Sequence, residues 1–203
     1  DVINEHRKVI YEQRNRILQG VDTRENVLSM VLDEIDEICE RVGNNPDLEL
    51  TELREILPAE DIPTEDEIED LGEEFGDEML AVAEERYETL EGLIGEENMR
   101  KVEHWLLLES IDFHWREHLT AIDDLRQSIG LQAYAQIDPL VAFKREGYDM
   151  YQQLQGNIRR QVARTVFKVR NVVTLNEQAN SWFGKAKMGL EYLLFQSGPM
   201  SMS

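Results

Sequence analysis

Apolar residues recur at helical spacing over two long segments, and this periodicity restricts what the chain can fold into. From residue 96 to 129 the apolar side chains step by three, four or five positions, and a second series runs from residue 139 to 169. Such steps place side chains on one face of an α-helix, whereas a strand requires alternation. We find no alternating segment long enough for a sheet. The sequence therefore predicts an all-α fold that contains two long helices.

The connection between these two helices raises a question. It reads IGLQAYAQIDPL from Ile129 to Leu140 and is short enough to make the pair an antiparallel hairpin. Asp138 is a favourable N-cap and Pro139 a favourable first helical residue, so they account for the start of the second helix. The apolar and aromatic residues before them are unusual for a solvated turn. They indicate either a contact surface or a cap on the hairpin core.

Shorter amphipathic helices are predicted before residue 96. Ile3, Ile10 and Ile17 recur at every seventh position, with Val2 and Val9 beside them, and a second apolar face follows from residue 27 to 38. Faces of this kind pack against partner helices. Turn residues at 43–47, the capping-box sequence TEDE at 64–67 and glycines at 92 and 95 divide the remainder into a small bundle.

Composition and charge exclude several classes of protein. The chain has 203 residues, of which 41% are hydrophobic, so it can bury a sizeable core. A formal net charge of −21 argues against a nucleic-acid binder, because phosphates require a basic face. The single cysteine, Cys39, excludes an internal disulfide. No signal peptide or membrane-spanning run is evident, and we expect a soluble protein of a reducing compartment, cut from a longer chain.

The charge is unevenly distributed along the chain. Residues 33–103 hold 27 acidic and 5 basic side chains, whereas residues 104–170 hold 8 acidic and 9 basic ones. This contrast predicts two modules with different surfaces. The acidic part is interpreted either as a solvated face that keeps the chain soluble or as an acidic helical module for protein interactions.

One short motif has the spacing of a catalytic metal site. HWREH, residues 114–118, fits the H-x-x-E-H pattern of inverted zincins. In such a site His114 and His118 would bind zinc and Glu117 would act as general base. The simpler interpretation places these histidines on or beside a helix packing face. The sequence contains neither of the common glycine-rich nucleotide-binding motifs.

A longer stretch carries a family resemblance. The segment ESIDFHWREHLTAIDDLRQSIGLQAYAQIDPLVAFKREGYDMY, residues 109–151, closely resembles the two-helix finger of SecA, the motor ATPase of bacterial and plastid protein translocation. HRKVIYEQRNRIL, residues 6–18, resembles the long scaffold helix of that family. The resemblance covers roughly residues 1–170. WREHL, residues 115–119, matches a finger helix of that family, which weakens the zinc interpretation, and His114 is not one of the matching positions.

The resemblance implies a division of the chain. Residues 1–38 correspond to the long-helix part of the helical scaffold, residues 39–98 to the helical wing, and residues 99–170 to the scaffold with its two-helix finger. Residues 171–203 match poorly and contain LFQSGP, which resembles protease-cleavable linkers of purification tags. We treat them as a tail of undetermined origin and base no functional expectation on them.

The resemblance also implies a function. In SecA the nucleotide sites lie in two upstream RecA-like motor domains, so this chain is expected to be non-catalytic and to hold no cofactor, with ATP and Mg²⁺ belonging to the parent motor. The implied partners are those motor domains, the SecY channel, and an unfolded preprotein or signal peptide. The implied location is cytoplasmic, peripheral at the inner membrane through the channel.

In the family, a tyrosine at the tip of the finger contacts the translocating polypeptide. The matching residue here is Tyr134. A tyrosine suits contacts with many sequences, because it combines an apolar ring with one polar group. The residues expected to contact the polypeptide or channel at the tip are Leu131, Gln132, Ala133, Tyr134, Ala135, Gln136 and Ile137.

Overall fold

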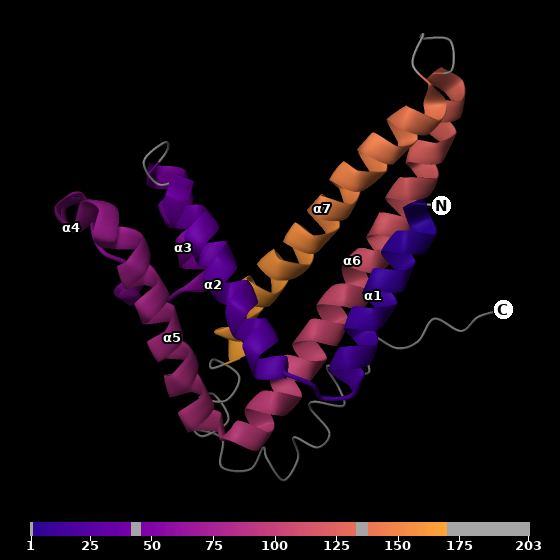
Figure 1. Ribbon diagram of the computed structural model, residues 1–203. Coiled ribbons are helices and arrows are strands. Elements are labelled where there is room, and N and C mark those ends of the chain that lie inside the picture. The colour runs from indigo at the N-terminus through magenta and orange to yellow at the C-terminus, as the bar shows by residue number, and fades with distance from the viewer. Residues whose placement is uncertain (1, 42–45, 133–137, 170–203) are drawn as a thin grey trace. The chain divides into compact units, whose positions relative to one another are not determined.

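The computed structural model describes residues 2–41, 46–132 and 138–169. Asp1–Phe167 form one compact unit, and a second unit begins at Lys168. Every element in the described ranges is helical, which confirms the all-α prediction. The α-helices in Figure 1 are α1 (Val2–Leu18), α2 (Thr23–Arg41), α3 (Pro46–Ile56), α4 (Glu65–Leu71), α5 (Phe75–Ile94), α6 (Glu96–Gln132) and α7 (Pro139–Val166). Two short 3₁₀ turns are η1 (Ala59–Asp61) and η2 (Gly72–Glu74).

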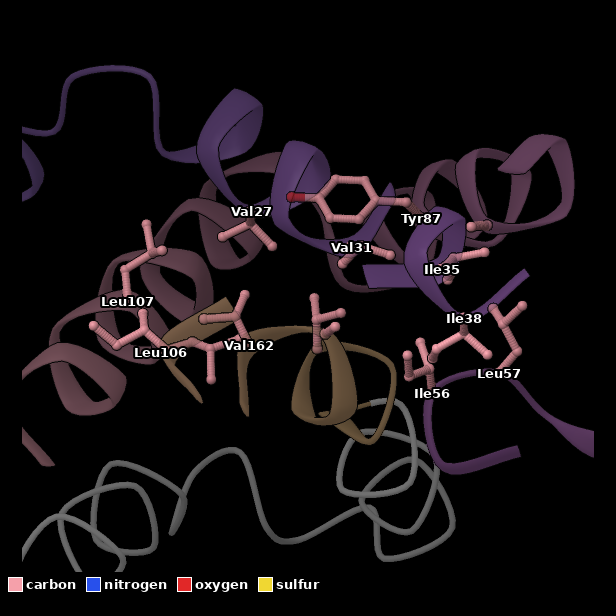
Figure 2. Packing of buried hydrophobic residues seen from close by; sticks show 14 of the residues in the cluster. Val27, Val31, Ile35, Ile38, Ile56, Leu57, Tyr87, Leu106, Leu107 and Val162 are labelled. Carbon is pink, nitrogen blue, oxygen red and sulfur yellow. The ribbon is translucent and has the colours of Figure 1, made fainter. Parts of the chain in front are cut away.

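Helix α2 lies at the centre of the apolar core. Its buried face presents Val27, Val31, Ile35 and Ile38 at the three- and four-residue spacing of one helix face. α5 and α7 both pack extensively against α2, and α3 and α6 also contact it. Figure 2 shows these α2 side chains in one cluster with residues of α3, α5, α6 and α7. The acidic bundle and the long helices therefore share a single core.

Two local signals in the acidic bundle behave as the sequence predicted, and a third does not. The Glu67 carboxylate accepts a hydrogen bond from the Thr64 backbone N–H at 2.8 Å, as in a capping box, and another at 2.8 Å from the Thr64 hydroxyl. Gly95 follows the last residue of α5 with φ of 84°, a conformation that favours glycine. Gly92 was expected to break the helix, and this was wrong. It lies inside α5, because a single exposed glycine costs a helix only about 1 kcal/mol.

Helix α1 runs antiparallel to α6 (Figure 1). Residues early in α1 meet residues late in α6, and residues late in α1 meet earlier ones, as the pairs His6–His118 and Arg14–Asp112 show. Ile10 and Ile17 are buried and Ile3 is partly buried, which confirms the packing face predicted from the seven-residue repeat. Val9, placed beside that face by the sequence, is instead exposed.

A glycine permits the close approach of α1 to α7. Gly147 is buried on α7, and a Cβ built there lies 3.1 Å from Cγ1 of Val2. That separation is shorter than ordinary van der Waals contact. The absence of a side chain at this position therefore lets the beginning of α1 lie against α7.

Two α7 glycines provide a matched test of this contact. Gly156→Leu should raise the free energy of unfolding by about 0.5–1 kcal/mol, because nothing lies within 4 Å of its Cβ and leucine favours the helix over glycine. Gly147→Leu should lower it by about 1–3 kcal/mol through overpacking against Val2. Urea denaturation followed by circular dichroism measures both. Equal effects of the two substitutions would contradict the close approach.

Candidate functional site

The predicted hairpin is the most extensive pairing of helices in the structure. α6 has 37 residues and is about 55 Å long, and α7 has 28 residues and is about 42 Å long. The two helices pack against each other, and α6 ends at residue 132 close to where α7 begins at residue 139 (Figure 1). α6 is longer than the sequence suggested, because the helix continues through Gly130 to Gln132.

The connection at the end of the hairpin is consequently shorter than predicted. Leu131 and Gln132 were expected in the loop, and this was wrong, because they form the last turn of α6. The start of α7 is confirmed: Pro139 is its first residue, and the Asp138 carboxylate accepts a hydrogen bond from the Leu140 N–H at 2.9 Å. The other candidate contact residues lie outside the described residues: Ala133, Tyr134, Ala135, Gln136 and Ile137.

An apolar surface next to the tip was not identified from the sequence. Leu140 and Val141, in the first turn of α7, are 60% and 59% exposed. Tyr148, further along this helix, is 61% exposed, although it belongs to the apolar series of residues 139–169 that was predicted to pack. Exposed apolar side chains therefore begin in the first turn of α7, which directly follows the tip segment in the sequence.

The far end of α7 is anchored by a buried carboxylate. Glu34 on α2 has a side chain only 3% exposed, and it accepts from Arg159 Nε at 2.9 Å and from Arg160 Nε at 3.2 Å. A buried charge of this kind needs such partners, because desolvation alone would cost several kcal/mol. Arg164 adds an ion pair to Glu55 of α3 at 2.8 Å. Charged contacts thus join the base of the hairpin to the acidic bundle.

A second buried carboxylate joins α2, α5 and α6. Glu103 on α6 is fully buried and accepts hydrogen bonds from Thr23 Oγ1 of α2, at 3.0 Å, and from the Tyr87 hydroxyl of α5. Arg100 Nη2 lies 3.0 Å from the same carboxylate. Burial raises the pKa of Glu103, and the two hydrogen bonds act in the opposite direction. The junction where α5 turns into α6 is therefore fixed to α2 by polar contacts.

The residues of the HWREH motif take part in different contacts. His114 Nδ1 lies 3.1 Å from Glu117 Oε2 at the surface, whereas His118 is buried and its Nε2 faces Nδ1 of His6 at 3.2 Å. Within the described ranges, no three His, Cys, Asp or Glu side chains gather in a way that could hold a metal ion. The geometry gives the zinc interpretation no support, and we assign no metal to this segment.

The buried charges are the positions that sequence reasoning missed. Glu34 and Glu103 each sit at helical spacing within an apolar face, Glu34 between Val31 and Ile38 and Glu103 between Met99 and Leu106. A carboxylate in that position was the available signal, since it must be buried with its partners. In a chain with 42 acidic residues this signal is easily overlooked.

Comparison with known proteins agrees with this architecture. The family model for the SecA wing and scaffold domain matches residues 1–170. The chain belongs to this SecA family. None of the helices in the described part of the chain is both long and apolar enough to cross a membrane.

Three relatives show the extent of the similarity. The protein translocase subunit SecA of Roseiflexus sp. (strain RS-1) is 38% identical over 184 residues, covering 83% of this chain and 18% of the relative. The SecA subunit of Dehalococcoides mccartyi (strain CBDB1) is 38% identical over 195 residues, covering 92% and 20%. That of Syntrophobacter fumaroxidans is 35% identical over 179 residues, covering 84% and 21%. The chain thus spans about a fifth of the length of these curated SecA relatives.

The anchoring role of Glu34 in this SecA scaffold can be tested by removing its charge. Glu34→Gln should lower the free energy of unfolding by about 1–3 kcal/mol, because Arg159 and Arg160 lose a charged acceptor at a buried site. Glu12→Gln is the control, since the Lys8–Glu12 pair is exposed and 3.9 Å apart and should contribute under about 0.5 kcal/mol. Urea unfolding curves compare the two variants. A loss at Glu34 no larger than at Glu12 would show that the cluster does not anchor α7.

Proposed function

We propose that this chain is the wing and scaffold part of a SecA-type preprotein translocase, and that its hairpin transmits ATP-driven motion to a polypeptide at the SecY channel. The observation that carries this proposal is the α6/α7 hairpin, anchored at one end and ending at the opposite one in a short connection with apolar neighbours. Membership of the SecA wing and scaffold family supports the assignment.

The hairpin has the mechanical properties that transmission requires. Two packed helices of this length resist bending better than a loop, so a displacement at the base is delivered to the tip. The base is held by apolar packing of Ile158 and Val162 of α7 in the shared core and by the pairs of Glu34 with Arg159 and Arg160. Motion of the bundle therefore moves the base of α7 with it.

The tip has the chemistry for contact with many different sequences. A translocated chain presents every kind of side chain, so its recognition cannot depend on one hydrogen-bond pattern. The Tyr134 ring offers apolar contact together with one hydroxyl group. Exposed Leu140 and Val141 provide apolar surface on the first turn of α7.

Other components of the proposed machine lie outside this chain. We assign ATP and Mg²⁺ to the motor domains of the whole protein, and we expect no ATP hydrolysis by residues 1–203 alone. The proposed partners are those motor domains, the SecY channel, and an unfolded preprotein or signal peptide. The proposed location is the cytoplasmic side of the inner membrane, where the protein is held by its contact with the channel.

Replacing the tip tyrosine in the full-length protein tests this function. Tyr134→Ala should reduce preprotein transport into SecY-containing membrane vesicles by roughly two- to tenfold, which corresponds to the loss of one aromatic contact. Tyr134→Phe should retain most of the transport, because the ring remains. The measurement is the ATP-dependent protection of a labelled preprotein from added protease.

Tyr148→Ala is the matched control. It removes an exposed tyrosine of α7, nine residues beyond Pro139 and therefore about 14 Å from the start of α7. We expect transport to be unchanged in this variant, and basal ATP hydrolysis and helical content to be unchanged in both alanine variants. If Tyr134→Ala transports at the wild-type rate, the assignment of the tip is wrong.

A further inference from the structure

Two buried histidines meet where α1 packs on the hairpin. His6 of α1 and His118 of α6 are 8% and 6% exposed, and Nδ1 of His6 lies 3.2 Å from Nε2 of His118. At this distance one ring donates an N–H and the other accepts it, so the contact requires a single proton between the two nitrogens.

Aromatic rings enclose the pair on both sides. His6 stacks on Tyr151 of α7 with ring centroids 4.5 Å apart, and His118 stacks on Trp115 with centroids 5.5 Å apart. The pair therefore connects all three helices, with α1 on one side and the two helices of the hairpin on the other. Burial among these rings withholds water from an imidazolium, and stacking on an aromatic face offsets only part of that cost.

We propose that the His6–His118 pair is a proton-sensitive latch, which holds the first half of α1 against the hairpin while both rings are neutral and releases it when they take up protons. This inference concerns the scaffold itself and does not depend on the proposed contact with a polypeptide.

Few charged groups act on the pair. On α1, Glu5 is the carboxylate that influences His6. On α6, Glu117 pairs with His114, and Arg116 donates a hydrogen bond to the Asp112 carbonyl at 3.1 Å, so neither contacts the histidine pair. On α7, the neighbouring titratable group is the phenol of Tyr151, which accepts from Gln155 Nε2 at 3.1 Å and stays neutral because burial raises its pKa.

The direction of the pH effect follows from these surroundings. Burial lowers the pKa of His6, and Glu5 opposes this by a smaller amount. Burial, reinforced by His6, lowers the pKa of His118 to about 4. Because the released rings titrate near 6.5, the released state binds more protons than the docked state between these values. The contribution to docking is therefore complete above pH 6.5 and is lost as the pH falls toward 4.

The remaining contacts of α1 determine which part moves. The beginning of α1 lies against Gly147 through Val2, and its second half is held by buried Ile10 and Ile17 and by the Arg14–Asp112 pair at 3.0 Å. Protonation of the histidines introduces like charges between these two groups of contacts. Release should consequently begin at the end of α1 that lies near Val2.

The latch can be tested with spin labels on the 203-residue chain. Asn4→Cys on α1 and Asp149→Cys on α7 provide exposed label sites in a Cys39→Ala background. At pH 7.5 the label distance should be single and short. Between pH 6.5 and 4 a longer component should appear, with the ratio of open to closed forms rising up to about tenfold per pH unit for each proton taken up. Histidine NMR on the unlabelled chain follows the titration of both rings.

Amide substitutions separate the latch from general acid effects. His6→Asn together with His118→Gln places amide groups near the positions of the two ring nitrogens but cannot take up protons, so the opening should lose its pH dependence in this range. His114→Gln, which changes a histidine outside the pair, should retain it.

Three results would overturn the proposal. One is equal acid opening in the doubly substituted chain, which would assign the effect to carboxylates such as Asp112. Another is a docked distance that persists to pH 4 in the wild-type chain. The third is titration of either histidine ring near pH 6.5 without a change in the label distance. NMR on the wild-type chain detects this result, so it decides the question if the double variant does not fold.

Discussion

The packing of α2 between α5 and α7 is the contact on which the rest of the structure depends. Val31 and Ile35 of α2 are fully buried in it. It places Glu34 beside Arg159 and Arg160, and it brings Thr23 to Glu103 at the junction of α5 and α6. Apolar burial supplies most of the stabilisation in such an arrangement, whereas the buried charges make it specific, because any other register leaves a carboxylate without its donors.

The local structure could be predicted from the sequence because its causes are local. Asp138 and Pro139 start α7, and Thr64 and Glu67 start α4. The repeat of Ile10 and Ile17 marks a packing face of α1. In each case the determining residues lie within a few helical turns of each other. The end of α6 was misjudged, since Gly130 only weakens a helix that its other residues favour.

The polar contacts of the scaffold could not be predicted in the same way. Glu34 bonds to a residue 125 positions away, Thr23 to one 80 away and His6 to one 112 away. Periodicity shows which face of a helix is buried, but it does not show which two faces meet. A histidine or glutamate on an apolar helix face therefore indicates that a buried polar partner is needed, but the sequence does not identify that partner. The residues at the tip were singled out by their chemistry and by family resemblance, neither of which requires knowledge of the packing.

The antiparallel course of α1 along α6 has a consequence for the order of events during synthesis. The ribosome makes α1 about a hundred residues before its partners on α6, as the separation of 112 positions between His6 and His118 shows. Closing so long a loop is slow compared with forming a local hairpin. We therefore expect α1 to emerge with Ile10 and Ile17 uncovered and to stay undocked until α6 has been translated.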